Sequence, residues 1–208
     1  MKICSVSVGR DFCEKYSQRV KQFAPKNIDL IILTDYPEYF DFCNTILYTE
    51  DVFSYFSKNT LVSNIAEKYK SDVLYIDIDS FHIVDIKKIN SHNFLYNKLW
   101  VDYPYSKLNE LPQAILDFYK INGNIEIENM NEYVFYLPYS NKVKKLKQDL
   151  IEIKKIWDNE TKNSEPKGNA KKYSKFGIGW GEGIPLSLAL KMNNIQMQKY
   201  SFTKQKLI

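Results

Sequence analysis

Glycine is scarce in this chain of 208 residues, and the shortage excludes several phosphate-binding motifs. There are seven glycines, and Gly9 is the only one in the first hundred residues. A G-x-x-x-x-G-K-[ST] loop and a G-x-G-x-x-G turn both need closely spaced glycines, because the backbone must approach the phosphates. Neither motif can therefore follow a strand in the first half of the chain.

Cysteines and long apolar runs are also few. Cys4, Cys13 and Cys43 cannot all pair with one another, and none belongs to a C-x-x-C, so neither a disulfide framework nor a zinc site is predicted. Apolar runs such as residues 30–33 are far shorter than a membrane span, and no signal peptide opens the sequence. We expect a cytoplasmic protein, bacterial or encoded by a virus and acting in the cytoplasm of its host.

Arginine is nearly absent: only Arg10 and Arg19 occur, and lysine carries most of the formal net charge of +4. That charge is too small for a dedicated nucleic-acid binder, in which we would expect a dense Arg/Lys stripe. It is compatible with a small polyanionic ligand such as a nucleoside diphosphate. With 44% hydrophobic and 26% charged residues, the chain has a globular composition.

Hydrophobic patterning predicts an α/β fold. In the first half, apolar runs predict strands, and helical spacing of apolar residues predicts the helices between them. The predicted strands are 3–8, 29–34, 44–48 and 73–78, and the predicted helices are 12–23 and 57–69. This alternation is typical of a three-layer sandwich around a mostly parallel sheet.

The second half is less regular. It predicts helices over 111–119, 141–157 and 185–191, a strand over 133–137 and an extended segment over 83–89. The polar, lysine-rich stretch 159–175 is predicted to be a loop.

The segment with the clearest chemical content is Val73-Leu74-Tyr75-Ile76-Asp77-Ile78-Asp79. An apolar strand delivers two carboxylates, and ligands of open α/β sheets bind at the carboxyl ends of the strands. Because side chains of a strand alternate, Asp77 and Asp79 are expected on one face, where they repel unless a cation lies between them. A hard divalent ion bound to diphosphate oxygens would relieve that repulsion, and Mn²⁺ or Mg²⁺ are the natural candidates.

The order of these segments resembles the nucleotide-sugar-binding half of GT-A glycosyltransferases. The residues that carry the resemblance are Lys58-Asn59-Thr60-Leu61-Val62-Ser63-Asn64 and then Ser71 to Asp79, which contains the D-x-D. The resemblance implies one GT-A-like domain over 1–208, with residues 1–90 holding the nucleotide-sugar and residues 91–208 the acceptor. From its composition alone, we also expect the lysine-rich stretch 159–175 to close over the donor.

The resemblance assigns roles to residues that match the family pattern. Asp79 would coordinate the metal, and Asp77 would contact the ribose or the metal through water. Lys58 would approach the ribose or diphosphate. The remaining nucleotide-sugar contacts would come from Val8, Gly9, Arg10, Thr34, Asp35 and Ile78. The late histidine ligand of many members is missing, since the only histidines are His82 and His92.

A second cluster precedes the last predicted helix, at Gly177-Ile178-Gly179-Trp180-Gly181-Glu182-Gly183. In the family, an acidic residue in a comparable position deprotonates the acceptor hydroxyl of inverting enzymes, so Glu182 is our first candidate for the base. Asp102 and Asp158 are further acidic candidates. The aromatic residues expected around an acceptor are Trp100, Tyr103 and Trp180.

Together these features predict a metal-dependent glycosyltransferase that moves a sugar from a nucleoside-diphosphate sugar to a hydroxyl of a glycan or other acceptor. UDP is favoured by the resemblance alone, and we favour inversion. Two alternatives stay open. One is a haloacid-dehalogenase-like phosphatase using Asp77 and Asp79, although its motif normally lies on the first strand. The other is a non-catalytic carbohydrate-binding protein, which would need no metal-dependent nucleotide binding.

Overall fold

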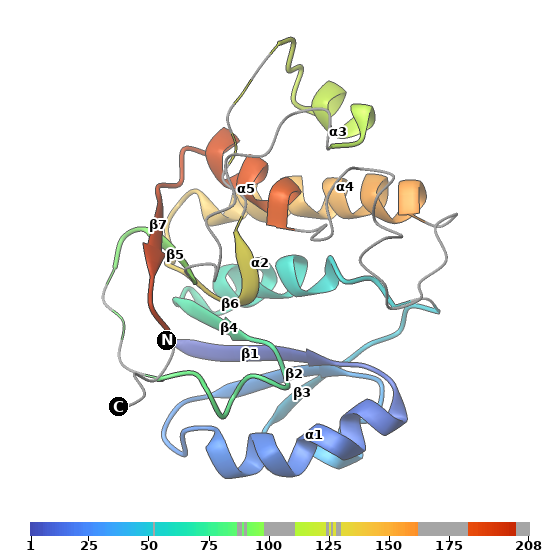
Figure 1. Ribbon diagram of the computed structural model, residues 1–208, viewed down its shortest axis with the longest axis vertical. Coiled ribbons are helices and arrows are strands. Elements are labelled where there is room, and N and C mark those ends of the chain that lie inside the picture. Colours follow the sequence, from blue (N-terminus) through green and yellow to red (C-terminus); the bar gives the residue numbers. More distant parts are fainter. Residues whose placement is uncertain are drawn as a thin grey trace.

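The computed structural model of the protein describes residues 1–51, 53–86, 89, 91–97, 111–123, 125, 127, 130–161 and 183–202 (Figure 1). The strands are β1 (Lys2–Ser7), β2 (Leu30–Thr34), β3 (Asn44–Leu47), β4 (Val73–Ile76), β5 (Phe94–Asn97), β6 (Asn131–Leu137) and β7 (Met197–Tyr200). The helices are α1 (Arg10–Phe23), α2 (Ser57–Tyr69), α3 (Gln113–Phe118), α4 (Val143–Thr161) and α5 (Gly183–Met192), with a 3₁₀ turn η1 at Pro37–Phe40.

The strands form one sheet in the order β3-β2-β1-β4-β6-β5-β7. Neighbouring strands are parallel except at β6, which runs antiparallel to both β4 and β5. The predicted α/β class with a mostly parallel sheet is therefore confirmed. Strands from both halves of the sequence contribute to this sheet.

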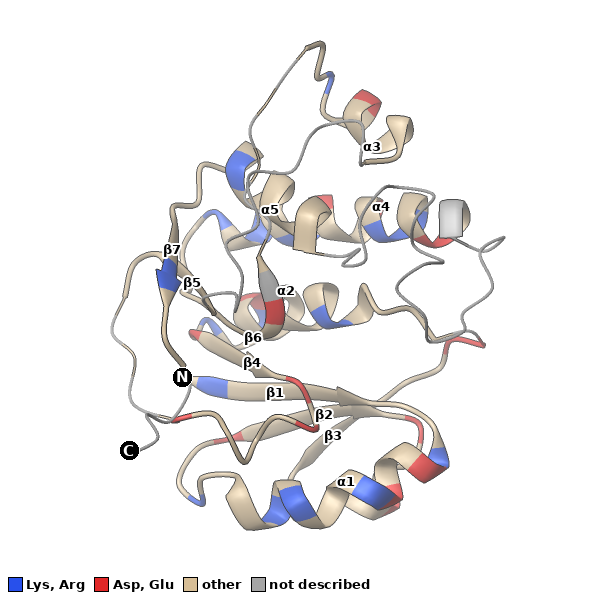
Figure 2. Cartoon of the chain, in the orientation of Figure 1, with Lys and Arg blue, Asp and Glu red and all other residues tan. Residues whose placement is uncertain are grey.

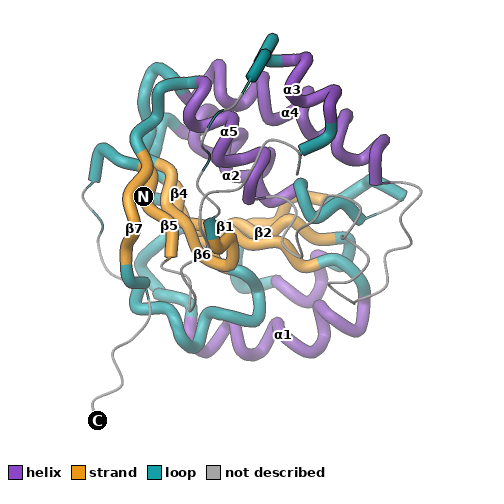
Figure 3. The backbone as a smooth tube through the Cα atoms, turned by 45° about the horizontal axis from the view of Figure 1, so that its top comes forward, coloured by secondary structure: helices purple, strands orange, loops and turns teal. Residues whose placement is uncertain are grey.

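Helices cover both faces of the sheet, as the tube view shows (Figure 3). Helix α1 lies on one face, while α2, α4 and α5 lie on the other, with α3 outside them. Side chains of β4 alternate between the two cores: Tyr75 packs in the core beneath α2 and α4, and Leu74 and Ile76 pack in the core beneath α1. Burial on both faces explains why the strands read as continuous apolar runs.

The direction of the strands defines one edge of the sheet, which we call the carboxyl edge. Strands β1, β2, β4 and β5 all end there, and β6 begins there because it runs the opposite way. The chain passes from β1 to β2 on one side and later returns to β4 on the other side of β1. Ligands of open α/β sheets bind outside the carboxyl ends of the strands at such a switch point.

The structure differs from the sequence predictions at several places. The segment 83–89, predicted as strand or extended, contains no strand among its described residues; residues 78–83 are turns, and Val84 forms a single bridge. Strand β4 ends at Ile76, two residues before the predicted end. Strands β5 and β7 were not predicted at all, because both are short and lack a distinctive hydrophobic period.

The three cysteines are free, as the sequence indicated. Over the described part of the chain, no helix combines the length and apolar character that a membrane span requires.

Candidate functional site

The ends of β1 and β2 are joined by Asp35. The backbone N–H of Gly9 donates to Oδ1 and Oδ2 of Asp35, at 2.9 and 3.1 Å. Gly9 has a φ of 95°, which side-chain-bearing residues rarely adopt, and it directly precedes α1. The predicted nucleotide-binding residues Gly9 and Asp35 therefore lie in direct contact at the carboxyl edge.

Beneath this contact the chain is tightly packed. The Thr34 side chain is buried, and its Oγ1 accepts a hydrogen bond from the N–H of Tyr36 and lies 3.3 Å from Cys13 Sγ. Burial raises the pKa of the Cys13 thiol, so it stays protonated at neutral pH. Val8, at the end of β1, is half-buried. Thr34 thus supports the corner, and its carbonyl accepts a hydrogen bond from the Tyr48 N–H at 2.8 Å, just after β3.

Arg10 lies on the outer side of this corner. Its side chain is exposed, and its Nε donates to the hydroxyl of Tyr39 at 3.4 Å. The hydrogen bond to Tyr39 raises the pKa of the guanidinium above its already high value. A permanently charged group at this corner suits a polyanionic ligand.

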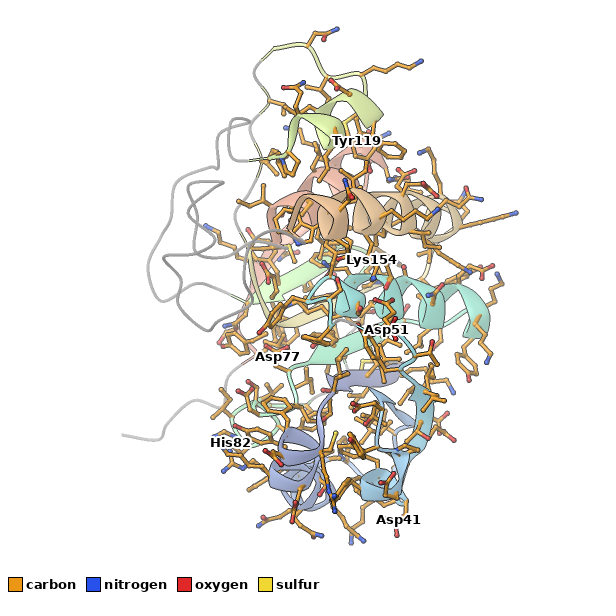
Figure 4. The ribbon with its side chains drawn as sticks, turned by 90° about the vertical axis from the view of Figure 1, so that its right-hand side faces the viewer. Asp41, Asp51, Asp77, His82, Tyr119 and Lys154 are labelled. Carbon is orange, nitrogen blue, oxygen red and sulfur yellow. The ribbon has the colours of Figure 1, made fainter. Side chains whose placement is uncertain are left out.

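The D-x-D begins where β4 ends. The N–H of Asp77 donates to the Tyr133 carbonyl at 2.7 Å, which extends the contact between β4 and β6 by one residue. The hydroxyl of Tyr75 donates to Asp77 Oδ1 at 2.7 Å, so the Asp77 carboxylate continues the face of the sheet on which Tyr75 lies. Figure 4 shows Asp77 at the level of the sheet.

Asp79 lies in a turn rather than in the strand. Its side chain is exposed, and its Oδ1 accepts a hydrogen bond from the hydroxyl of Ser80 at 2.9 Å. The alternation expected from a strand over 73–78 therefore does not determine where Asp79 points, which corrects the sequence prediction. Ile78, between the two carboxylates, is buried in the core beneath α1, so only its backbone is available to a ligand.

The donor set of this turn fits a hard divalent cation. Both carboxylates supply oxygen, the ligand that Mn²⁺ and Mg²⁺ prefer, and Asp79 is accessible. No cluster of three or more His, Cys, Asp or Glu side chains suited to a metal occurs within the described residues. A cation held here would complete its shell with water or with phosphate oxygens, as Mg²⁺ commonly does.

Lys58 is not a surface lysine. It lies in the first turn of α2, is only 8% exposed, and its Nζ donates to Glu132 Oε2 at 3.1 Å. The same ammonium lies 6.0 Å from the centre of the Tyr75 ring, whose hydroxyl contacts Asp77. Lys58 lies near the ring of Tyr75, and Asp77 accepts from its hydroxyl. The Lys58 ammonium and the predicted metal site therefore share Tyr75 as a neighbour.

Sequence analysis missed Glu132, the partner of Lys58. It is the second residue of β6, 8% exposed, and lies at the carboxyl edge because β6 begins there. Oε1 of Glu132 contacts the start of α5 so closely that a Cβ on Gly183 would lie 2.2 Å from it. The available signal in the sequence was a glutamate at the start of an otherwise β-prone run.

Figure 2 shows acidic positions where the chain leaves β4 and at the base of β6. Helices α1 and α2 begin at the same edge, and α5 begins against Glu132. The amino ends of helices favour anions. The carboxyl edge therefore offers carboxylates for a cation together with helix ends and Lys58 for an anion, as a metal–diphosphate ligand requires.

Asp158 and His82 make contacts of their own. Asp158, on α4, accepts hydrogen bonds from Ser54 and from Lys154, whose Nζ also donates to Glu50 at 2.7 Å. It joins α4 to the segment between β3 and α2. His82 lies beside Phe23, the last residue of α1, with ring centres 6.3 Å apart (Figure 4 labels His82).

The predicted acceptor and base residues lie outside the described residues. They are Trp100, Asp102, Tyr103, Trp180 and Glu182. The strand that precedes the first three, β5, ends at the carboxyl edge. The helix that follows Glu182, α5, begins against Glu132 at that edge.

No protein-family model matches the chain, and no curated protein matches it either. Among solved structures, the chain is similar to the crystal structure of a glycosyltransferase involved in the glycosylation of the major capsid of PBCV-1. The identity is 12%, the match covers 97% of this chain and 82% of that one, and the TM-score is 0.40. Because this likeness is weak, we base the function on the residues of the carboxyl edge alone.

Proposed function

We propose that this protein is a GT-A-like glycosyltransferase that transfers a sugar from a nucleoside-diphosphate sugar to a hydroxyl acceptor. The observation that carries the proposal is the position of Asp77 and Asp79. They follow β4 directly at the carboxyl edge, next to β1 across the switch point of the sheet. This is where α/β sheets of this type bind nucleotides.

The donor would bind as a complex with Mn²⁺ or Mg²⁺. Asp79 would hold the cation, with Asp77 beside it and oriented by Tyr75. The bound cation would supply Lewis-acid neutralisation of the leaving diphosphate. Lys58 would add a second positive charge on the diphosphate side.

The nucleoside would lie along the corner between β1 and β2. The candidates there are Val8, Gly9, Arg10, Thr34 and Asp35, together with the backbone of Ile78. We favour UDP because the resemblance to the family favours it. The Gly9–Asp35 contact supports a fixed wall for the nucleoside at this corner.

The acceptor would bind where β5 ends and α5 begins. Trp100, Tyr103 and Trp180 are proposed to stack on sugar rings, and Glu182 is proposed as the base of an inverting reaction, with Asp102 as the second candidate. Replacing Glu182 with Gln tests this role. An inverting enzyme would lose nearly all transfer, whereas a retaining enzyme would keep substantial activity.

The phosphatase alternative fits the chain order less well. Three strands precede β4, whereas that family normally carries the D-x-D on its first strand. Here the first strand ends in Ser7, and no carboxylate follows it before α1.

The first experiment is calorimetric titration of UDP, GDP and dTDP, each with and without Mn²⁺. The proteins are the wild type, Asp79→Asn, and the matched control Asp41→Asn. Asp41 is an exposed aspartate just before the amino end of β3, at the edge of the sheet opposite the carboxyl edge. Lys21 Nζ lies 3.9 Å from its Oδ1. We expect one nucleotide to bind only with Mn²⁺, Asp79→Asn to abolish that binding, and Asp41→Asn to leave it unchanged.

Two results would overturn the proposal. If no nucleotide binds in a metal-dependent way, the D-x-D is a strand end, and the phosphatase and carbohydrate-binding alternatives gain weight. If binding is metal-dependent but Asp79→Asn leaves it intact, the cation is held elsewhere. Once a nucleotide is known, its sugar derivatives are tested for metal-dependent release of the free sugar.

A further inference from the structure

The ion pair between Lys58 and Glu132 joins residues 74 positions apart, on α2 and β6. Both side chains are almost fully withdrawn from solvent, at 10% and 9% exposure. Removing two charges from water is costly and is not repaid reliably by their attraction. A buried pair beside a candidate ligand site therefore calls for an explanation other than stability.

The two carboxylate oxygens of Glu132 have different neighbours. Lys58 donates to Oε2, and the amino end of α5 lies against Oε1. Helix α5 has ten residues, and the amino end of a helix of this length carries a partial positive charge. The Glu132 carboxylate is thus enclosed between a lysine and the start of a helix.

The pair itself carries no net charge. An unpaired Lys58 would attract a diphosphate directly, but Glu132 offsets that charge at a distance of 3.1 Å. Beside Lys58 and Glu132 lie the two carboxylates of the proposed metal site, Asp77 and Asp79, so carboxylates outnumber cations among these four side chains. The summed charge of these four side chains therefore repels an anionic ligand until a cation binds.

We propose that Glu132 makes binding of the nucleoside diphosphate conditional on the divalent cation. It acts by neutralising Lys58, so that the ligand gains a net attraction only when the metal has occupied the Asp77–Asp79 turn. The Tyr75 ring connects the two parts, since Lys58 Nζ is 6.0 Å from its centre and its hydroxyl donates to Asp77. This inference rests on the proposed function and goes beyond it by assigning the metal requirement to one residue.

The test measures UDP affinity in Mn²⁺ and in EDTA. The result is the ratio of the affinity in Mn²⁺ to the affinity in EDTA. Glu132→Gln keeps the size of the side chain and a hydrogen-bond acceptor but removes its charge. We expect affinity in EDTA to rise by roughly tenfold, the effect of one charge at about 10 Å in an effective dielectric of about 20, so the ratio falls. Lys58→Met removes the opposite charge, and we expect the ratio to rise.

The matched control is Asp149→Asn. Asp149 is also a buried carboxylate bonded to a lysine, with Lys145 Nζ 2.9 Å from both oxygens, but it lies on α4 beside Asn193 and Tyr119. We expect this variant to lose stability without changing the ratio.

The outcomes separate the inference from the function on which it rests. If the wild type shows no metal-dependent binding of any nucleotide, the proposed function has failed. If the wild type binds as expected but Glu132→Gln weakens binding equally with and without Mn²⁺, the pair is only structural and the inference is overturned. Lys58→Met gives an independent answer if Glu132→Gln does not fold, because an unchanged ratio in Lys58→Met also overturns it.

Discussion

The N–H of Gly9 donates to both oxygens of the Asp35 carboxylate, and this forked contact fixes the ends of β1 and β2 relative to each other. The Asp35 carboxylate therefore has a structural role besides any contact with a ligand. Its position in the proposed nucleoside site is fixed before a ligand binds. The same bond provides the first prediction.

Asp35→Ala should lower the free energy of unfolding by about 1–3 kcal/mol, because the Gly9 N–H loses a charged acceptor. Asp35→Asn keeps one oxygen acceptor and should cost less. Urea unfolding followed by circular dichroism measures both, with Asp41→Asn as the control at an exposed aspartate. Equal losses in the Ala and Asn variants would contradict the role of the retained acceptor.

Gly183→Ala should be more damaging than Gly9→Ala. A Cβ at Gly183 would lie 2.2 Å from Glu132 Oε1 and 2.8 Å from the Met130 carbonyl, whereas a Cβ at Gly9 meets nothing within 4 Å. The Gly9 variant pays only for its φ of 95°, about 1–2 kcal/mol.

A double-mutant cycle with Glu132→Ala separates the two contacts of Gly183. Truncating Glu132 removes the nearer clash, so the losses of Gly183→Ala and Glu132→Ala should be less than additive by about 0.5–3 kcal/mol. Strict additivity in unfolding experiments would mean that the Met130 carbonyl alone excludes the side chain.

Lys154→Met should destabilise the fold without changing nucleotide affinity. Burial alone would lower the pKa of Lys154, but hydrogen bonds to Asp158 and Glu50 outweigh it and raise that pKa. The lysine is therefore charged at neutral pH, and its loss leaves two carboxylates facing each other (Figure 4 shows Lys154). We expect a loss of about 1–3 kcal/mol in urea unfolding. A large change in nucleotide affinity would instead place Asp158 in the ligand site.

The cysteines should react slowly with thiol reagents, and Cys43 should react first. Cys4 and Cys13 are buried, whereas Cys43 is partly exposed. Burial, and then the Asp41 charge, raise the pKa of Cys43 to about 11 from an ordinary value of 9.0. Only the thiolate reacts, so labelling at pH 8 should be about 100-fold slower than in the unfolded chain and should accelerate with pH up to about 11.

Mass spectrometry after brief labelling identifies which cysteine has reacted. Asp41→Asn removes the neighbouring charge and should accelerate labelling of Cys43 alone. If Cys13 reacts before Cys43, the packing of Cys13 against Ser7 and Thr34 is looser than described.

The parallel half of the sheet could be predicted because its signals are local. The runs that became β1, β2 and β4 are apolar on both faces, and the helices between them have apolar residues at helical spacing. The end of β4 carried the acidic pair that located the candidate site. By contrast, β5 and β7 are four residues each and are specified by pairing with distant strands, which a single sequence does not reveal.

Glu132 shows the same limit within the site. A buried glutamate cannot be recognised unless its partner is known, and Lys58 is 74 residues earlier in the chain. The reversed direction of β6 brings the two together, and no property of residues 131–137 indicates that direction. The sequence could place Lys58 at the start of a helix, but it could not show that the helix begins against a buried carboxylate.

The pairing of β5 with β7 has a consequence for how the chain folds. The bond from Asn93 Nδ2 to Gln198 Oε1 spans 105 residues, and β5 and β7 lie side by side at one end of the sheet. Contacts of such long range close slowly, because the entropy of closing the loop is lost before the contact forms. During synthesis β5 remains an open edge until residue 200 has emerged, and in that interval it can pair with another chain. Yield from expression should therefore depend on temperature and chaperones more than on the final stability of the protein.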